Sequence, residues 1–203
     1  YNWGVFDFAT PNFVWKFAKG RLEYMLGAYS FERFMQEYIY EERSVYQQKL
    51  NLEPAEIDIL ISLVSENLKP ENLRYRYDFF YDNCATRIRD LIEKTVGSKL
   101  FYPPEMPADI PSFRTKITEY QQPYPWLLFG IDLLLGTPAD KKADLRARMF
   151  LPLELKKGLS DARVNRNGKM IPLLQNPSTL ASFNPAEVKK SFLAAPLFLF
   201  SML

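Results

Sequence analysis

The chain has 203 residues, 47% of them hydrophobic, so it is long enough to bury a core and is not expected to be disordered. Its 26 basic and 24 acidic residues are mixed along the sequence and leave a net charge of +2, which offers a nucleic acid no basic surface to bind. One cysteine and no histidine exclude an internal disulfide, a Cys/His metal site and a histidine base within these residues. The glycines form no phosphate-binding loop, so neither a metal nor a cofactor is expected.

The first predicted element is a strand, because Tyr1, Trp3 and Val5 alternate with other residues. The alternation is already under way at the first residue, so we expect a segment to precede it. The elements predicted next are a turn at 8–12, a helical segment at 13–19 ended by Gly20, a strand at 21–28, a helix at 30–38 capped by Ser30, and a strand at 44–52.

An amphipathic helix follows, with Pro54 in its first turn and Pro70 beyond its end. Its apolar spacing predicts five inward-facing residues: Ile57, Leu60, Ile61, Val64 and Leu68.

The central segment, 74–97, predicts a strand at 74–80 followed by a helix. Asp82 and Asn83 are N-cap residues, Cys84 opens the helix, and Gly97 supplies its stop. The residues predicted to share the inward face of this helix are Cys84, Ile88, Leu91 and Ile92.

Two interpretations of Cys84 remain open. A thiol in the first turn of a helix lies near free backbone N–H groups and the positive end of the helix dipole, which favour the thiolate that a nucleophile needs. A lone cysteine can equally be a small, buried hydrophobic residue. The polar residues Asp82 and Asn83 place Cys84 beside charge, so it is the candidate nucleophile.

Beyond residue 100 the sequence predicts a proline-rich irregular segment at 101–111, an apolar stretch at 127–135, and helical structure at 139–157 broken at Pro152. Within the apolar stretch, Asp132 either makes a cap or salt link or faces a binding cleft. A hairpin turning at Asn167–Gly168 and a polar linker at 176–185 follow. The uncharged run at 196–203 is either the start of a membrane-spanning segment or a terminal amphipathic helix.

Five sequence blocks, in this order, carry a family resemblance: YNWGVFDFATPNFVWKFAKGRLEYMLG, FERFMQEYIYEERSVYQQKLNL, YRYDFFYDNCATRIRDLIE, LLFGIDLLLG and MFLPLEL. Together they resemble the N-terminal periplasmic domain of the Lnb-type bacterial lipoprotein N-acyltransferases, most specifically around DNCATR. The resemblance implies an acyltransferase-like domain over 1–175, with 176–203 as a linker and the start of an apolar, possible transmembrane, segment.

The resemblance implies that Cys84 is the catalytic nucleophile. In that family the histidine partner lies upstream of the YNWG-like strand, which is the part of the domain that this sequence does not contain. We therefore expect an α+β fold, with an antiparallel sheet packed on helices in a permuted papain-like thiol domain that is missing its N-terminal histidine segment. Without that histidine we expect these 203 residues to be inactive.

The implied function is transfer of an acyl chain through a Cys84 thioester to the α-amine of a lipoprotein's lipidated N-terminal cysteine. The expected partners are membrane lipoproteins, a lipid acyl donor and the membrane, with no nucleic acid, and the expected location is the periplasmic face of the inner membrane in the cell envelope. The alternatives are a papain-like cysteine hydrolase of peptides or amides in the envelope, and a non-catalytic envelope-binding module.

Asn2 is the third supporting candidate, after Asp82 and Asn83. If the missing histidine lies on a strand next to the first one, Asn2 would face the Cys84 helix and orient the imidazole, whereas Asp7 would lie on the opposite face. The alternative is that Asn2 only satisfies the edge of a strand or a turn.

Overall fold

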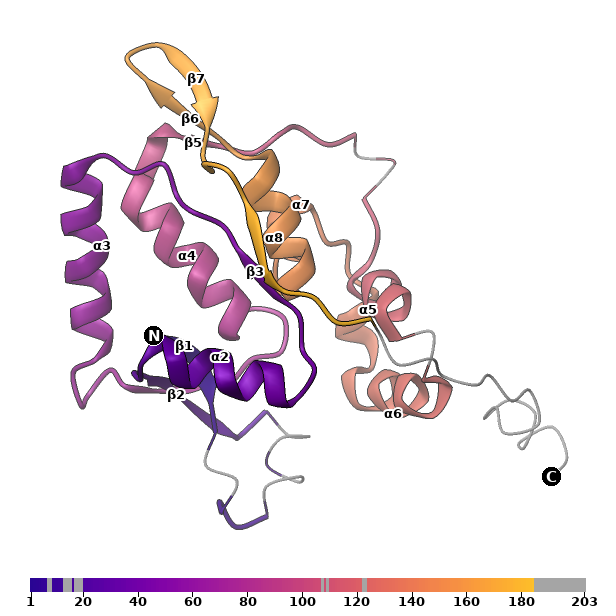
Figure 1. The fold of residues 1–203 in the computed structure, drawn as a ribbon. Coiled ribbons are helices and arrows are strands. Elements are labelled where there is room, and N and C mark those ends of the chain that lie inside the picture. Colours follow the sequence, from indigo (N-terminus) through magenta and orange to yellow (C-terminus); the bar gives the residue numbers. More distant parts are fainter. Residues whose placement is uncertain are drawn as a thin grey trace, which may run out of the picture. The chain divides into compact units, whose positions relative to one another are not determined.

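The computed structural model describes residues 1–6, 9–12, 16, 20–106, 108, 110–121 and 124–184, and its fold is α+β with antiparallel sheets, as predicted (Figure 1). The chain divides into two compact units. The first unit is Tyr1–Pro104 with Leu145–Phe183, and the second is Glu105–Asp144 with Asn184–Leu203.

The first sheet of the first unit has the strand order β1-β2-β4 and is antiparallel throughout. Its strands are β1 (Asn2–Val5), β2 (Glu23–Gly27) and β4 (Arg74–Arg76). The strand predicted at 74–80 ends after Arg76 because the Asp78 carboxylate accepts hydrogen bonds from the N–H groups of Phe80 and Tyr81. These bonds form a turn that competes with the strand.

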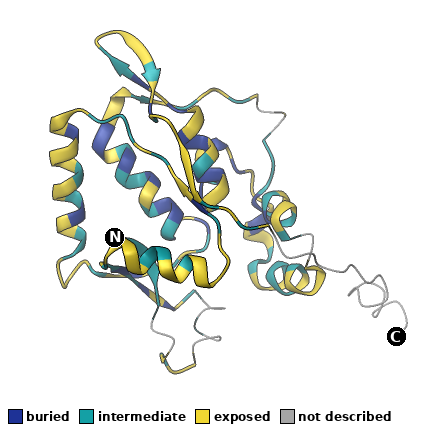
Figure 2. Cartoon of the chain, viewed as in Figure 1, coloured by how far each residue is buried: buried dark blue, intermediate teal, exposed yellow. Residues whose placement is uncertain are grey.

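Helix α4 (Cys84–Val96) begins and ends where the sequence predicts, but its buried face differs from the predicted one. The face that packs on the core carries Ala85, Arg89, Ile92 and Val96, so only Ile92 of the predicted set is fully buried (Figure 2). The core against which α4 packs comes mainly from α7 (Leu145–Arg148), α8 (Pro152–Asp161) and the segment that follows them. Cys84 therefore lies beside the main core and not within it.

Helices α2 (Phe31–Tyr40) and α3 (Pro54–Asn67) also form as predicted. The Ser30 hydroxyl accepts a hydrogen bond from the Arg33 N–H, which confirms the predicted cap. On α3 the predicted inward face is partly wrong, since Ile57 and Ile61 are 45% and 58% exposed. Val64 is buried as predicted, and the other buried residue of α3 is Glu56.

Glu56 is buried because Arg166 satisfies its charge. The Arg166 guanidinium donates to both Glu56 carboxylate oxygens, at 2.6 and 2.5 Å, and to the Asn51 carbonyl at 3.0 Å. Arg166 ends β6 (Arg163–Arg166), which pairs with β5 (Leu100–Phe101) and β7 (Lys169–Pro172). This bidentate pair thus joins the start of α3 to the β6–β7 hairpin.

The predicted hairpin turn is confirmed: Asn167 and Gly168 join β6 to β7 with positive φ angles of 51° and 82°. The segment expected as a polar linker contains a further strand, β8 (Ser178–Ala181), which pairs with β3 (Val45–Gln47). Strand β8 is only four residues long, Ser-Thr-Leu-Ala, without alternation of polar and apolar residues, and three of the four are exposed, so neither pattern nor length marks it as a strand.

The second unit contains α5 (Phe113–Gln121), α6 (Pro125–Leu135) and the 3-10 turn η3 (Thr137–Asp140). Arg114 on α5 binds the carboxylates of Asp132 and Asp140. Asp132 is therefore salt-linked, which supports the first of its two interpretations. The helix predicted over 139–157 is divided: η3 belongs to this unit, α7 and α8 to the first, and no α-helix connects η3 to α7.

Some expectations concern residues outside the described part of the chain: the helical segment at 13–19 apart from Lys16, the position of Asp7, and the apolar run at 196–203. Among the described residues, no helix combines the length and the apolar character needed to cross a membrane.

The buried Glu56–Arg166 pair generates a stability prediction. Arg166→Leu should lower the free energy of unfolding at neutral pH by about 3 to 5 kcal/mol, because it leaves a carboxylate buried without its partner. Lys99→Leu is the control, since Lys99 is exposed and lies 3.8 Å from the same carboxylate, and it should cost less than about 1 kcal/mol.

The pH dependence of the free energy of unfolding should have opposite signs in the wild-type protein and in Arg166→Leu. Burial alone would raise the pKa of Glu56, but the hydrogen bonds from Arg166 and from the Glu53 N–H, together with the Arg166 charge, outweigh it and lower the pKa in the folded protein. Wild-type protein therefore loses stability as the pH falls through this pKa, whereas Arg166→Leu should gain stability on acidification toward about pH 4.5 because burial then raises the pKa. Urea denaturation across this range tests the prediction, and parallel pH profiles for the two proteins would contradict it.

Candidate active site

Cys84 is the first residue of α4, and Asn83 is the N-cap that holds this end of the helix. The Asn83 side-chain oxygen accepts hydrogen bonds from the N–H groups of Ala85 and Thr86, and the Thr86 hydroxyl accepts one from the Asn83 N–H. The Asn83 amide donates to the carbonyls of Phe79 and Phe150, at 2.8 and 3.0 Å. Every polar group of the buried Asn83 side chain makes a hydrogen bond. These bonds hold the residues before and after Cys84, and so they fix the position of Cys84.

The thiol of Cys84 is partly exposed, and two opposing effects act on it. Burial raises its pKa, whereas the N–H groups of Ala85 and Cys84 at the start of the helix lower it. Burial prevails, so the lowered pKa expected from the helix terminus is not found. A thiol in this setting needs a base to become a thiolate near neutral pH.

Strand β1 comes close to the first turn of α4 at Gly4. A Cβ atom at Gly4 would lie 3.1 Å from the Cys84 Cβ and 3.8 Å from its Sγ. Gly4 also has a φ of 105°, and the register of β1 and β2 shifts between Trp3 and Val5. The absence of a side chain thus allows both the irregular backbone and the close contact.

Three tyrosines lie near Cys84: Tyr24 on β2, Tyr75 on β4, and Tyr77 directly after β4. The rings of Tyr24 and Tyr77 stack with centroids 4.1 Å apart, and Tyr75 lies 6.0 Å from Tyr24. Burial raises the pKa of all three, and that of Tyr77 rises to about 12, with the Cys84 charge as its second cause. Sequence analysis missed this cluster, although the period-two spacing of Tyr75 and Tyr77 predicts a shared face.

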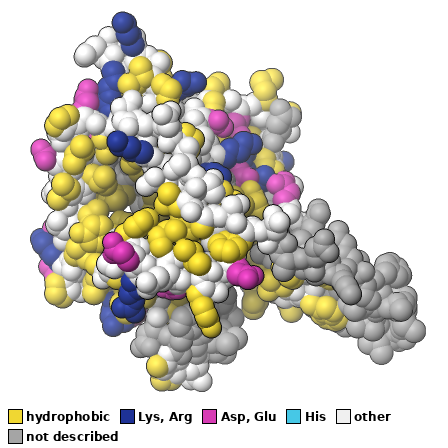
Figure 3. Space-filling model, viewed as in Figure 1, with side chains coloured by type: hydrophobic (Ala, Val, Ile, Leu, Met, Phe, Trp, Pro, Cys, Tyr) yellow, Lys and Arg dark blue, Asp and Glu magenta, His cyan; other side chains and the backbone are white. Residues whose placement is uncertain are grey.

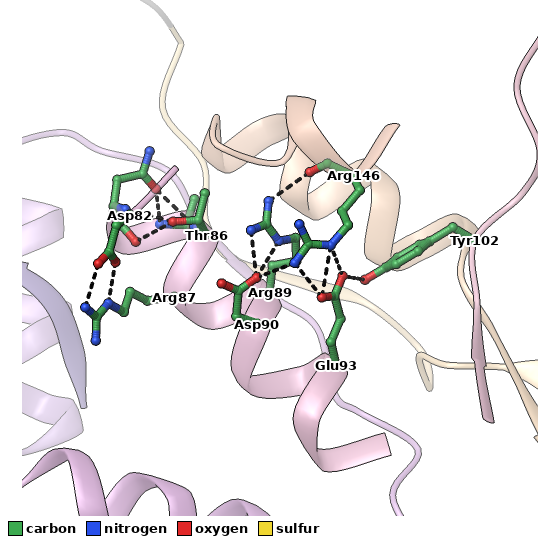
Figure 4. Close-up of polar contacts among 10 residues, drawn as sticks. Asp82, Thr86, Arg87, Arg89, Asp90, Glu93, Tyr102 and Arg146 are labelled. Carbon is green, nitrogen blue, oxygen red and sulfur yellow. Dashed lines mark hydrogen bonds and ion pairs between the residues drawn. The ribbon is translucent and has the colours of Figure 1, made fainter. Parts of the chain in front are cut away.

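The Asp82 carboxylate forms an ion pair with Arg87, with contacts of 2.5 and 2.7 Å (Figure 4). Arg87 also lies over the ring of Tyr75, 3.9 Å from its centroid. Asp82 is therefore not the N-cap, and this part of its prediction is wrong: Asn83 alone caps the helix. The ion pair with Asp82 holds the Arg87 guanidinium over the ring of Tyr75 on β4.

Asn2 is held by a tyrosine in the segment between β2 and α2. Its amide donates a hydrogen bond to the Tyr29 hydroxyl at 2.5 Å. Asn2 and Gly4 are two residues apart on β1, but the irregularity at Gly4 means that parity alone does not place Asn2 toward Cys84. Its role in orienting a histidine stays a prediction.

A second polar cluster lies further along α4 and has a structural role. Arg146 binds Asp90 and Glu93, Tyr102 donates to Glu93, and the buried Arg89 donates to the Arg146 carbonyl (Figure 4). These contacts hold α4 against α7.

A cavity of about 330 Å³ opens between β1, α3 and α4, next to the first turn of α4. The charged groups that line it balance: Asp82 and Asp90 against Arg87 and Lys94. Across the described residues there is no group of three or more acidic, cysteine or histidine side chains that could hold a metal ion.

A family model described as the Lnb N-terminal periplasmic domain matches residues 1–114, which include β1, the tyrosine cluster and all of α4. This confirms the family expected from the sequence blocks. No curated protein and no solved structure matches the chain.

The contact at Gly4 generates a prediction about the site. Gly4→Ala should lower the free energy of unfolding by about 1 to 3 kcal/mol, because alanine at positive φ is strained and its Cβ presses on Cys84. It should also change the rate at which Cys84 reacts with a thiol reagent. The control is Gly130→Ala, whose added Cβ would meet no atom within 4 Å on α6 and should be neutral or stabilising. Equal effects of the two substitutions would contradict the assigned role of Gly4.

Proposed function

The chain belongs to the family of the Lnb N-terminal periplasmic domain, and from this premise we propose that it is the thiol domain of a lipoprotein N-acyltransferase. The observation that carries the proposal is the placement of Cys84 at the capped start of α4, partly exposed, with backbone N–H groups directed at its sulfur. Family membership itself indicates a periplasmic, enzyme-associated domain.

The proposed reaction has two steps. In the first, the Cys84 sulfur attacks the carbonyl carbon of an acyl ester, a C–S bond forms, the ester C–O bond breaks, and the alcohol leaves with the proton of the thiol. In the second, the α-amine of the lipoprotein's lipidated cysteine attacks the thioester carbon, an amide C–N bond forms, the C–S bond breaks, and the Cys84 sulfur leaves and takes up the proton lost by the amine. N–H groups at the start of α4 stabilise the negative oxygen in both steps.

The base is the component that these residues do not supply. The 203 residues contain no histidine, and burial raises the pKa of the Cys84 thiol. We propose that a histidine from outside this sequence takes the thiol proton, and that Asn2 or a neighbour on β1 orients it.

Exposed hydrophobic side chains support a lipid-bearing partner. They gather over α2 and α3 on one face of the first unit (Figure 3). On α2 these are Phe31, Ile39 and Tyr40, and on α3 they are Ile57, Ile59 and Ile61. Such a face suits membrane lipoproteins and a lipid acyl donor at the periplasmic face of the inner membrane.

The nucleophile is tested by Cys84→Ala in the full-length protein. N-acylation of a diacylated lipoprotein, measured by mass spectrometry of its N-terminal peptide, should fall to background, while the melting temperature stays within a few degrees because the cap is intact. Cys84→Ser, which keeps a polar side chain at the site, is the matched control for folding. Acylation by Cys84→Ala at the wild-type rate would refute the mechanism, and release of free fatty acid without N-acylation would favour the hydrolase.

The missing base is tested with the 203-residue chain itself. Alone it should show no turnover, and added imidazole should restore a Cys84-dependent fraction of ester cleavage, because free imidazole can take the thiol proton. The same titration with the Cys84→Ala chain separates this effect from cleavage by imidazole alone. Full activity of the 203-residue chain without imidazole would show that the base lies within it.

A further inference from the structure

A buried tyrosine beside Cys84 has a hydroxyl group with no hydrogen-bond partner in the part of the chain that the structure describes. Tyr75 is only 8% exposed, and its Oη is the buried side-chain atom left without a partner there. A buried hydroxyl without a partner is costly, because it has lost its bonds to water and gained none. Tyr75 therefore marks a place where another polar atom can bind.

The surroundings of Tyr75 place this hydroxyl in the layer that holds the thiol. Tyr75 and Tyr24 are paired in register across β4 and β2, so their side chains share one face of the sheet. The Tyr24 ring and the Cys84 Sγ each lie 3.8 Å from the Cβ position of Gly4. Arg87, in the first turn of α4, covers the Tyr75 ring. The start of α4 thus lies over the face that carries Tyr75.

The hydroxyl is suited to donate a hydrogen bond. Burial raises the pKa of Tyr75 despite the opposing charge of Arg87, so the group keeps its proton across the whole neutral range. The side chains of the neighbouring Tyr77 and Tyr24 form a hydrogen bond with each other. Among the three described tyrosines, Tyr75 is the one whose buried hydroxyl is left to donate to another group. The proposed reaction brings one new acceptor to the thiol, the carbonyl oxygen of the acyl group.

We propose that Tyr75 is a catalytic residue that donates a hydrogen bond from its hydroxyl to the acyl carbonyl oxygen while Cys84 attacks the carbonyl carbon. The inference rests on the proposed acyl transfer and deepens it. As the C–S bond forms, electrons move onto this oxygen, and the Tyr75 hydroxyl and the backbone N–H of Cys84 stabilise the charge together. Tyr75 keeps its proton throughout, so it transfers no atom.

The first test compares Tyr75→Phe with Tyr102→Phe in the full-length protein. Tyr102 is also a tyrosine with a raised pKa, but its hydroxyl is used by Glu93 in the structural cluster of α4. Tyr75→Phe should lower kcat about 10²-fold and leave the melting temperature unchanged or a few degrees higher, because a costly unpaired hydroxyl is removed. Tyr102→Phe should lower the melting temperature and leave kcat unchanged. Wild-type kcat in Tyr75→Phe would overturn the inference.

The second test does not need lipoprotein acylation. Cys84 is reacted with p-nitrophenyl butyrate, in which the thiolate attacks a carbonyl, and with methyl methanethiosulfonate, in which it attacks sulfur. Tyr75→Phe should slow the first reaction at least about tenfold and leave the second unchanged. Equal slowing of both reactions would mean that Tyr75 only positions the thiol, which would overturn the inference.

The two tests separate the inference from the proposed function. If wild-type protein does not N-acylate lipoproteins but its reaction with the ester depends on Tyr75, the function fails and the inference stands. If lipoprotein acylation is observed and Tyr75→Phe alters neither kcat nor the reaction with the ester, only the inference fails.

Discussion

The geometry of the site depends on one buried amide, the side chain of Asn83. It is 4% exposed and joins three segments: the turn before α4, the first turn of α4, and the loop at Phe150 between α7 and α8. No other side chain of similar size can replace it, because aspartate has no N–H to donate and serine cannot reach both carbonyls. Since each unpaired buried group costs about 1 to 3 kcal/mol, the local fold is stable only when all these bonds form together.

The hydrogen bonds of Asn83 also determine which face of α4 packs on the core. With Asn83 bonded to Phe150, the next residues turn Ala85 and Arg89 toward α7 and α8, where Arg89 donates to the Arg146 carbonyl. Cys84 then faces β1, and the strand can approach only because Gly4 has no side chain. The packing of the opposite side of α4 on the core therefore fixes the position of Cys84, and substitutions in that core should shift the thiol.

Local signals in the sequence were enough to predict much of the fold. Ser30, Asn83 and Gly97 mark helix ends, and Asn167–Gly168 marks a turn, since each acts through its own backbone or side chain. The buried faces of α3 and α4 could not be predicted in this way. Glu56 is buried because the distant Arg166 satisfies its charge, and Arg89 is buried because the adjacent Asp90 pairs with its charge while the distant Arg146 carbonyl accepts a further hydrogen bond. A pattern that counts charged residues as exposed therefore places the wrong face inward. The site shows the same division: Cys84 and Asn83 were found from their neighbours in sequence, whereas Tyr75 needed the pairing of β4 with β2.

Burial raises the pKa values of both the thiol and the tyrosines, but the consequences for function are opposite. It raises the pKa of Cys84, which disfavours the nucleophilic thiolate, and it raises the pKa of Tyr75, which keeps a hydrogen-bond donor protonated. A site with these properties does not favour ionisation of its thiol, and under the proposed mechanism its tyrosine hydroxyl would stabilise the oxyanion once the sulfur has attacked. In the proposed mechanism, a base from another segment would take the thiol proton and so form the thiolate. Under the proposed acyl transfer, a cysteine in a hydrophobic, aromatic setting can still serve as the nucleophile, because the described residues would position the sulfur and the carbonyl oxygen while another segment would remove the proton.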